Sequence, residues 1–241
     1  MDARGGQQEP HADRAVSRER AALSLRPPLA LLGLRRRLLL WLARAFVRVT
    51  MDLRASGLHH LPPGPAILAP NHLSHLDPVV AALLDSPPEV VGLSDLRREL
   101  VAPIFFLYAV IPVRRDEVDR EVLSAVLAAL KRGERVMLFP EATISRTGGL
   151  EQARAGVGYL ALRAGVPLVP IALTGTDTAL RHWKRLKRPR VTVTVAPPFD
   201  PAPGAAQPRR EQRQAVTDDL MSRIAAHLPP AYRGHCREPL S

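Results

Sequence analysis

The sequence is poor in cysteine and aromatic residues, and none of its uncharged hydrophobic runs is long enough to cross a membrane. The single cysteine, Cys236, excludes an internal disulfide and a zinc site built from cysteines. Aromatic residues make up 4% of the 241 residues, too few for a surface that stacks the bases of single-stranded nucleic acid. No group of potential ligands has the spacing of a metal site, so we expect neither a metal ion nor another cofactor.

Positive charge, by contrast, is abundant. Lysine and arginine number 34 against 23 acidic residues, which gives a formal net charge of +11. Such a balance points to an anionic partner: nucleic acid, an acidic membrane surface or a phosphorylated substrate. Residues 181–190 (RHWKRLKRPR) could grip phosphates, but no helix-turn-helix or zinc-finger spacing is present. We therefore expect no nucleic acid, and interpret this run as a solvated or membrane-facing helix and loop.

The N-terminal region divides into two parts. Residues 1–26 are polar and mixed in charge, which predicts a disordered tail rather than a secretory signal. Residues 27–50 are rich in leucine, but arginines interrupt every apolar stretch. A spanning helix needs about 20 mostly apolar residues, and an arginine at its centre costs about 2.5–3.5 kcal/mol on insertion scales.

This composition favours a helix that lies in the membrane interface, within a membrane-associating element over residues 27–56. Leu38, Leu42 and Phe46 would face acyl chains, while the arginines meet the phosphates of an anionic membrane surface. The alternative is an amphipathic helix that packs on its own domain. The predicted location is peripheral or monotopic, on the cytoplasmic face of the plasma membrane.

Residues 57–230 are predicted to form the main domain, followed by a short tail over 231–241. Apolar residues make up 46% of the chain, enough to bury a core. Aliphatic runs predict strands at 66–70, 90–94, 135–139, 168–173 and 191–195. Amphipathic patterns predict helices at 119–132, 152–164 and 214–228. Their alternation predicts an α/β fold with a mostly parallel sheet flanked by helices. The run 101–113 is either core or part of an apolar acyl-binding wall.

The first group of candidate site residues follows the strand at 66–70. His72 and Asp77 are five residues apart, so on a regular helix they would point in different directions. They can meet if His72 lies on the turn before a helix and Asp77 in its first turn. Ser74 and Asp77 have capping-box spacing, and Pro78 is tolerated there. A histidine held by a carboxylate is a competent general base, although Asp77 could also be only a helix cap.

The second group follows the strand at 135–139. Glu141, Thr143, Ser145 and Arg146 lie within a few residues of the strand end. Hydroxyls and backbone amides can donate to a polyol or a phosphate, arginine adds charge, and a glutamate can accept from a substrate hydroxyl. An ordinary polar loop would have the same composition, so this group alone does not decide between the two.

Together, the two groups resemble a known enzyme family. NHLSHLD matches the NHxxxxD signature, and FPEATIS resembles the FPEGTRS signature, of the 1-acyl-sn-glycerol-3-phosphate acyltransferases. RREL and PVRR, between them, resemble that family's acceptor-binding segment, and GVPLVPIAL resembles its final VPxxPV strand. The similarity covers roughly residues 35–200, and the combination is more specific than any single motif.

This resemblance implies roles for particular residues. His72 would be the general base and Asp77 its partner. Glu141, Thr143 and Ser145 would lie at the glycerol-phosphate site. Phosphate would be bound by arginines: Arg115 at the family's arginine position, and Arg154 where the family usually has a lysine.

Two positions depart from the family pattern. Ala142 replaces a glycine, which is tolerable only where the backbone is not left-handed. Ile144 replaces an arginine, which is not a conservative change. Arg146, two positions on, can take over only if the loop shifts its register. Otherwise the acceptor lacks a phosphate there, or binds it through Arg115 and Arg154.

The predicted reaction is transfer of an acyl group from acyl-CoA or acyl carrier protein to the hydroxyl of a lysophospholipid acceptor, lysophosphatidate. His72 would remove the hydroxyl proton, and backbone amides near Ser74 or at Asn71 would stabilise the oxyanion. Two alternatives stay open. One is a different lysolipid acceptor, and the other is a non-catalytic basic protein that binds membranes or nucleic acid.

Overall fold

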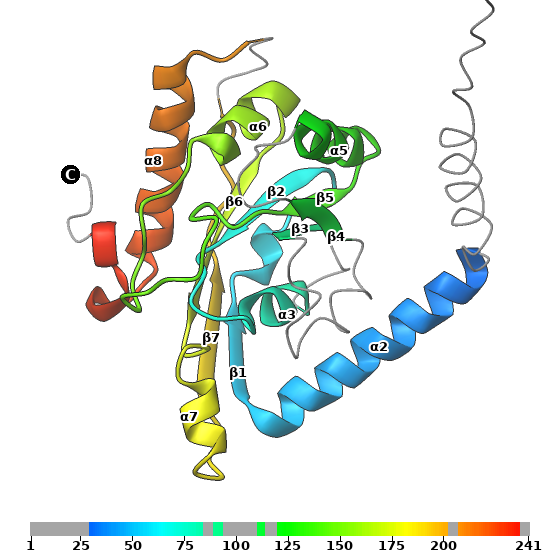
Figure 1. Ribbon diagram of the computed structural model, residues 1–241, viewed down its shortest axis with the longest axis vertical. Helices are drawn as coiled ribbons and strands as arrows, with labels where there is room; N and C mark the ends of the chain where they lie inside the picture. The colour runs from blue at the N-terminus through cyan, green and yellow to red at the C-terminus, as the bar shows by residue number, and fades with distance from the viewer. Residues whose placement is uncertain (1–28, 84–88, 94–109, 114–119, 202–206, 237–241) are drawn as a thin grey trace, which may run out of the picture. The chain divides into compact units, whose positions relative to one another are not determined.

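The computed structural model describes residues 29–83, 89–93, 110–113, 120–201 and 207–236. Contacts between residues divide the chain into two units, Met1–Leu38 and Leu39–Ser241. Helix α2 runs from Leu29 to Thr50, and from Leu39 onward it belongs to the second unit. All further description concerns this second unit (Figure 1). None of the helices in the described part of the chain combines the length and apolar character needed to cross a membrane.

The centre of the unit is a sheet in which the described residues form seven strands, in the order β1-β7-β6-β2-β5-β3-β4. All neighbouring strands are parallel except β6 and β7, which are antiparallel. The strands are β1 (Asp52–Ser56), β2 (Ala66–Pro70), β3 (Glu89–Leu93), β4 (Val110–Val113), β5 (Arg135–Met137), β6 (Leu168–Thr174) and β7 (Arg190–Val195). The predicted α/β fold with a mostly parallel sheet is therefore confirmed.

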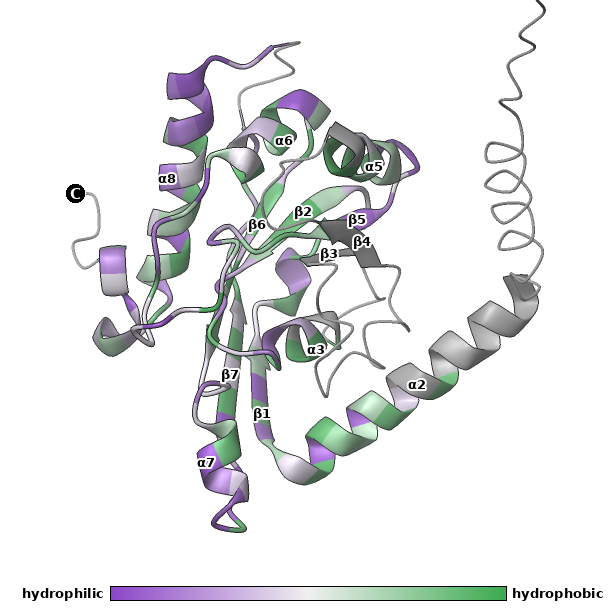
Figure 2. Cartoon of the chain, viewed as in Figure 1, coloured by the Kyte–Doolittle hydropathy of each residue, from purple (hydrophilic) through white to green (hydrophobic). Residues whose placement is uncertain are grey.

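Helices cover both faces of this sheet (Figures 1 and 2). Successive side chains of a strand point to opposite faces, and those of β2 accordingly divide between two hydrophobic clusters. One cluster contains α5 (Arg120–Lys131), α6 (Gly156–Ala164) and α8 (Arg210–Ala226). The other contains the second half of α2, α3 (Asp77–Ala82) and Trp183 of α7 (Ala179–Trp183). Because both faces of β2 are covered, all five of its residues are buried.

Five strands and three helices lie where the sequence predicts them, with shifts at some ends. Helix α6 begins at Gly156 rather than at residue 152, because the preceding residues form a loop in which Arg154 N–H donates to the Pro140 carbonyl. Helix α8 begins at Arg210 rather than at residue 214. There the Gln212 side chain accepts from the Arg209 N–H, which caps the helix start.

Two strands were not predicted. Strand β1 is an edge strand with the sequence DLRAS, and among the described strands it pairs with β7 alone. Its polar, partly exposed residues give no hydrophobic pattern to detect. Strand β4 is the end of the apolar run 101–113, most of which lies outside the described residues.

The order of the strands places the two candidate motifs together. Strand β2 lies between β5 and β6, and all three run in the same direction. Leu68 pairs with Met137, so the segments that follow β2 and β5 leave the sheet at the same edge. The carboxyl ends of parallel strands are the usual place for a binding site in such sheets. This edge therefore holds the candidate active site.

Candidate active site

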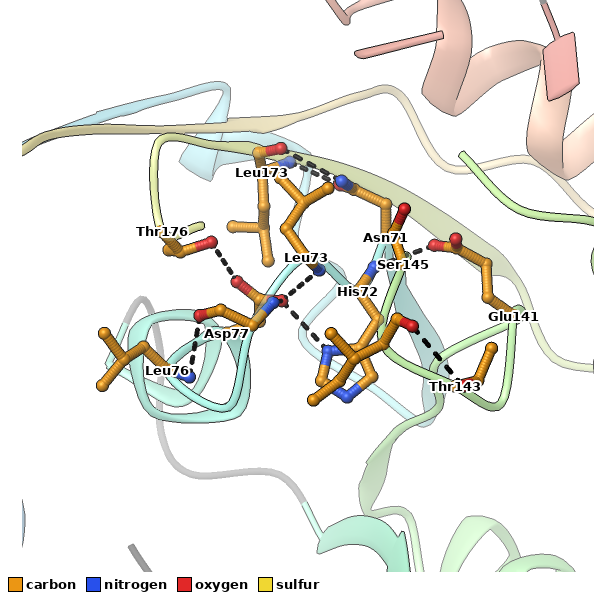
Figure 3. A network of polar contacts seen from close by, with 12 residues as sticks. Asn71, His72, Leu73, Leu76, Asp77, Glu141, Thr143, Ser145, Leu173 and Thr176 are labelled. Carbon is orange, nitrogen blue, oxygen red and sulfur yellow. Dashed lines mark hydrogen bonds and ion pairs between the residues drawn. The ribbon is translucent and has the colours of Figure 1, made fainter. Parts of the chain in front are cut away.

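His72 and Asp77 meet as the sequence predicts. His72 lies in the turn after β2, and α3 begins at Asp77 itself. The Nδ1 atom of His72 is 3.0 Å from Oδ2 of Asp77 (Figure 3). The Ser74 N–H also donates to this oxygen, at 2.6 Å, as a capping box requires. The Ser74 hydroxyl, however, accepts from the Leu76 N–H rather than from that of Asp77.

The Asp77 carboxylate is fully buried and surrounded by donors. Besides the His72 ring and the Ser74 N–H, Oδ2 accepts the Leu73 N–H at 2.5 Å. Oδ1 accepts the hydroxyl of Thr176, which follows β6. A carboxylate with 0% exposure is stable only when hydrogen bonds replace its water. These donors also fix the direction in which the carboxylate faces the imidazole.

The imidazole of His72 is held on a second side by an aromatic ring. Phe139 lies against it with ring centroids 4.2 Å apart and planes inclined by 30°. The side chain of His72 keeps 15% of its surface exposed. Because Asp77 occupies Nδ1, the proton of a neutral His72 lies on Nδ1 and Nε2 is left as the basic atom. In the described part of the chain, no hydrogen bond to Nε2 is present, so this atom can accept a proton from outside.

Glu141 lies beside this pair, but its carboxylate binds backbone amides. One oxygen accepts the His72 N–H at 2.8 Å, and the other accepts the Glu151 N–H at 2.7 Å. The residue is 2% exposed, and this burial raises the pKa of Glu141 to about 7. Glu141 therefore ties the turn after β2 to the loop after β5. A contact between Glu141 and a substrate hydroxyl stays a prediction.

Asn71 and the Ser74 amide were expected to stabilise an oxyanion, but both are already engaged. The side chain of Asn71 exchanges two hydrogen bonds with the backbone of Leu173, at 3.1 and 2.6 Å. The Asn71 N–H donates to the Ile171 carbonyl, and the Ser74 N–H to Asp77. These donors join β2 to β6 and support the His72 turn, so they are already used within the fold. Stabilisation of an oxyanion by the other backbone amides near Ser74 stays a prediction.

The loop after β5 is closed by its own hydroxyls. The Ser145 hydroxyl donates to the Gly149 carbonyl at 2.6 Å and accepts the Gly148 N–H at 3.0 Å. The Ser145 N–H donates to the His72 carbonyl at 2.8 Å, which is a second tie between the two motifs. Thr143 is exposed, and its hydroxyl is 3.5 Å from the Ile144 carbonyl. Substrate contacts by Thr143 and Ser145 stay predictions.

Glu151 organises this loop from the other end. Its Oε1 accepts the Arg146 N–H at 3.0 Å and the Thr147 hydroxyl at 3.1 Å. These bonds, that of the Arg146 N–H above all, hold the pKa of Glu151 below its usual value. The loop therefore has its own internal framework, in addition to its ties to the His72 turn.

Two of the arginines expected to bind phosphate lie on the surface. Arg146 and Arg154 are exposed, whereas Ile144 is half-buried. Arg115 lies outside the described residues. Ala142 has a φ of +53°, in the left-handed region that favours glycine. We expected alanine to replace the family's glycine only where the backbone is not left-handed, and here it is left-handed. An alanine in this conformation costs about 1–2 kcal/mol relative to an ordinary one.

Three residues of the site were not expected from the sequence. Thr176 supports Asp77, Phe139 supports the His72 ring, and Glu151 closes the loop after β5. The rule that strand ends gather at one edge could have identified Thr176, because it comes two residues after β6. Glu151 carries no such signal, since a glutamate in a loop is ordinary.

Comparisons with known proteins identify the family of this chain. Residues 52–174 match the family model described as Acyltransferase. The 1-acyl-sn-glycerol-3-phosphate acyltransferase of Salmonella typhimurium is 32% identical over 144 residues, which cover 57% of this chain and 58% of that protein. The protein of the same name from Pseudomonas aeruginosa is 25% identical over 78% of this chain and 76% of its own length.

A solved structure shows the same fold. The crystal structure of the 1-acyl-sn-glycerophosphate (LPA) acyltransferase PlsC from Thermotoga maritima superimposes with a TM-score of 0.60. The match covers 77% of this chain and 76% of that one, at 21% identity. The family model spans strands β1 to β6 along the chain and both candidate motifs. The chain therefore belongs to the acyltransferase family.

Proposed function

We propose that this protein is a 1-acyl-sn-glycerol-3-phosphate acyltransferase, which forms phosphatidate from lysophosphatidate and an acyl thioester. The observation that carries the proposal is the 3.0 Å contact between His72 Nδ1 and Asp77 Oδ2, which leaves Nε2 available as a base. The names of the relatives support the choice of substrate class. The donor is acyl-CoA or acyl carrier protein, and the reaction asks for no further cofactor.

In the proposed reaction, Nε2 of His72 removes the proton of the free hydroxyl as its oxygen attacks the thioester carbonyl. The imidazolium that forms is stabilised by the buried carboxylate of Asp77. Collapse of the tetrahedral intermediate breaks the carbon–sulfur bond, and the imidazolium returns its proton to the departing thiolate. The products are an ester and a free thiol, and His72 is neutral again. General-base catalysis of this kind contributes about 10²–10⁴-fold.

The acceptor would bind beside the loop after β5. This loop touches the His72 turn through Ser145 and Glu141, so a headgroup bound there would lie next to the imidazole. Arg146 and Arg154 are exposed near this loop and could bind the phosphate. Arg115 is proposed as a third ligand on the family resemblance alone.

The protein would work at a membrane surface. Trp41, Leu42, Phe46 and Val49 of α2 are exposed, while Val47 of the same helix is buried against the domain. The helix thus packs on the domain with one side and presents apolar side chains with the other. We place the protein peripherally on the cytoplasmic face of the plasma membrane, where thioester donors are available.

One observation favours a second candidate acceptor. Ile144 stands where the family has an arginine, and an isoleucine cannot bind a phosphomonoester. The second candidate is therefore a lysolipid whose phosphate is a diester.

The test is an assay of the full chain with labelled acyl-CoA, or labelled acyl carrier protein, and a panel of lysolipids. Labelled phosphatidate from lysophosphatidate supports the first proposal. Preference for lysophosphatidylcholine or lysophosphatidylglycerol supports the second. Absence of transfer to every lysolipid from both donors would overturn both.

A further inference from the structure

A short segment between β6 and β7 combines exposed leucines with positive charge. It comprises residues 180–188, that is, most of α7 and the loop that leads to β7, and is here named the α7 tip (Figure 1). Leu186 is 98% exposed and Leu180 is 67% exposed. In Figure 2 the segment alternates between hydrophilic and hydrophobic colours. Leu186 gains almost nothing from the folded domain and Leu180 gains little, so a membrane or another partner could bury both side chains.

The backbone of Leu186 is in an unusual conformation. Its φ is +53°, in the left-handed region that favours glycine. Its N–H donates to the Trp183 carbonyl and the Lys187 N–H donates to the His182 carbonyl, both at 2.9 Å. This is the Schellman pattern that ends a helix, in which the left-handed position is usually glycine. A leucine there is strained and also exposed, and residues with strained backbones cluster at functional sites.

Cations surround this leucine. Lys184, Arg185 and Lys187 are all exposed, and none takes part in a salt bridge between described residues. Lysine and arginine can reach lipid phosphates while their aliphatic stems lie along apolar surface. A nucleic acid would be attracted by the same charges but would leave the leucine in water. The combination of leucine and cations fits an anionic membrane better.

The α7 tip is fixed beside the exposed face of α2. Trp183 donates from Nε1 to the Thr50 carbonyl at 2.9 Å, and its ring meets that of Phe46 at 5.7 Å between centroids. The Arg188 guanidinium donates to the carbonyls of Arg48 and Met51, at 2.7 and 2.5 Å. These contacts fix the tip to the C-terminal end of α2, where Phe46 is itself exposed.

We propose that the α7 tip is a second membrane contact, in which Leu186 and Leu180 enter the boundary between headgroups and acyl chains. Lys184, Arg185 and Lys187 bind the phosphates of anionic lipids around them. The proposal rests on the membrane location proposed above, but not on the catalytic roles of His72 and Asp77. It adds a contact that the α2 helix alone would not provide.

The substitution Leu186→Gly should raise the stability of the protein and lower its affinity for membranes. Glycine relieves the left-handed strain, so the variant should unfold at higher urea concentration than the wild-type chain. It also removes the leucine side chain, so binding to vesicles of phosphatidylcholine and phosphatidylglycerol should weaken by about tenfold. A stabilised variant that binds these vesicles as tightly as the wild type would overturn the proposal.

A charge variant tests whether the cations of the α7 tip bind anionic lipids. Replacement of Lys184, Arg185 and Lys187 by glutamine should weaken binding to the same vesicles by roughly fivefold per charge, with little change for phosphatidylcholine alone. The matched control replaces Lys131, Arg163 and Arg210, which are exposed on the helices of the opposite sheet face. If both triple variants lost vesicle binding equally, the effect would be one of net charge, and this would contradict the proposal that the α7 tip itself contacts the membrane. Tighter binding to an oligonucleotide than to vesicles, lost in the tip variant, would also overturn the proposal.

A measurement of acyl transfer distinguishes failure of the catalytic proposal from failure of the membrane-contact proposal. With a short-chain lysophosphatidate that stays monomeric, Leu186→Gly should retain wild-type transfer, because none of the hydrogen bonds among described residues joins Leu186 to His72 or Asp77. Loss of that activity in the stabilised variant would contradict a purely membrane-binding role. If the wild-type chain transfers no acyl group, the function proposed above fails, while the vesicle measurements still decide the role of the tip.

Discussion

Two buried carboxylates lie at the same edge of the sheet, and they differ in what they bind. Asp77 accepts from an imidazole, a hydroxyl and two backbone amides. Glu141 accepts from two backbone amides, those of His72 and Glu151. Asp77 therefore acts on the side chain of His72, while Glu141 acts on its main chain. One carboxylate orients the proposed base, and the other holds the turn that carries it.

The difference also has an electrostatic side. Burial raises the pKa of Glu141 to about 7, because two amides replace only part of the lost hydration. A group with a raised pKa stabilises the fold most when it is protonated. Two buried acids, each in a segment that follows a strand of the sheet, thus have separate roles.

The largest effect is expected from Asp77→Asn. Asparagine has one acceptor oxygen instead of two and no negative charge, so it holds the His72 ring less firmly and no longer stabilises the imidazolium. We expect kcat to fall roughly 10³–10⁴-fold. Circular dichroism checks that the variant is folded. Thr176→Val, which removes one donor but leaves the ring contact, is the matched control and should lose far less. A folded Asp77→Asn protein with wild-type kcat would remove Asp77 from the mechanism.

A smaller effect, on stability, is expected from Glu141→Gln. Glutamine can accept only one of the two amide bonds, so we expect a loss of about 1–3 kcal/mol in urea unfolding. Because the folded state of the wild type holds the Glu141 proton more tightly, the stabilisation is complete below pH 4.5 and is lost as the pH rises through about 7. The difference between wild type and variant should therefore shrink from about pH 5 to about pH 8. A difference that does not change with pH would contradict the raised pKa.

The smallest effect is expected from Ala142→Gly, next to Glu141. Glycine removes the cost of the left-handed backbone but adds freedom to the unfolded chain, so the net stabilisation should be about 0.5–1 kcal/mol. Ala128→Gly, on the exposed side of α5, is the matched control and should destabilise by about 1 kcal/mol. Destabilisation by both substitutions would show that Ala142 is not strained.

The His72–Asp77 pair could be predicted because its signals are local. The two residues are five apart, and the capping spacing and Pro78 indicate where the helix begins. The buried strands β2 and β6 were predictable for a similar reason, since each is a short aliphatic run.

What the sequence could not provide depends on contacts between distant segments. Thr176 is 99 residues from Asp77 in the chain, and only the strand order brings them together. Edge strand β1 has no hydrophobic pattern, because it is paired on one side and largely exposed. The hydroxyl of Ser145 is of the type that binds substrate, yet the structure places it in bonds within its own loop. Such internal bonds depend on the loop conformation, which composition does not determine.

The most direct test of the central claim is transfer from acyl-CoA to lysophosphatidate by His72→Ala, compared with His75→Ala in the same loop. The first substitution removes the proposed base but keeps the His72 N–H bond to Glu141, so the turn should stay folded. We predict that His72→Ala loses about 10²–10⁴-fold in kcat, while His75→Ala, which replaces an exposed residue, stays near wild type. Near-normal transfer by a folded His72→Ala protein would contradict the account.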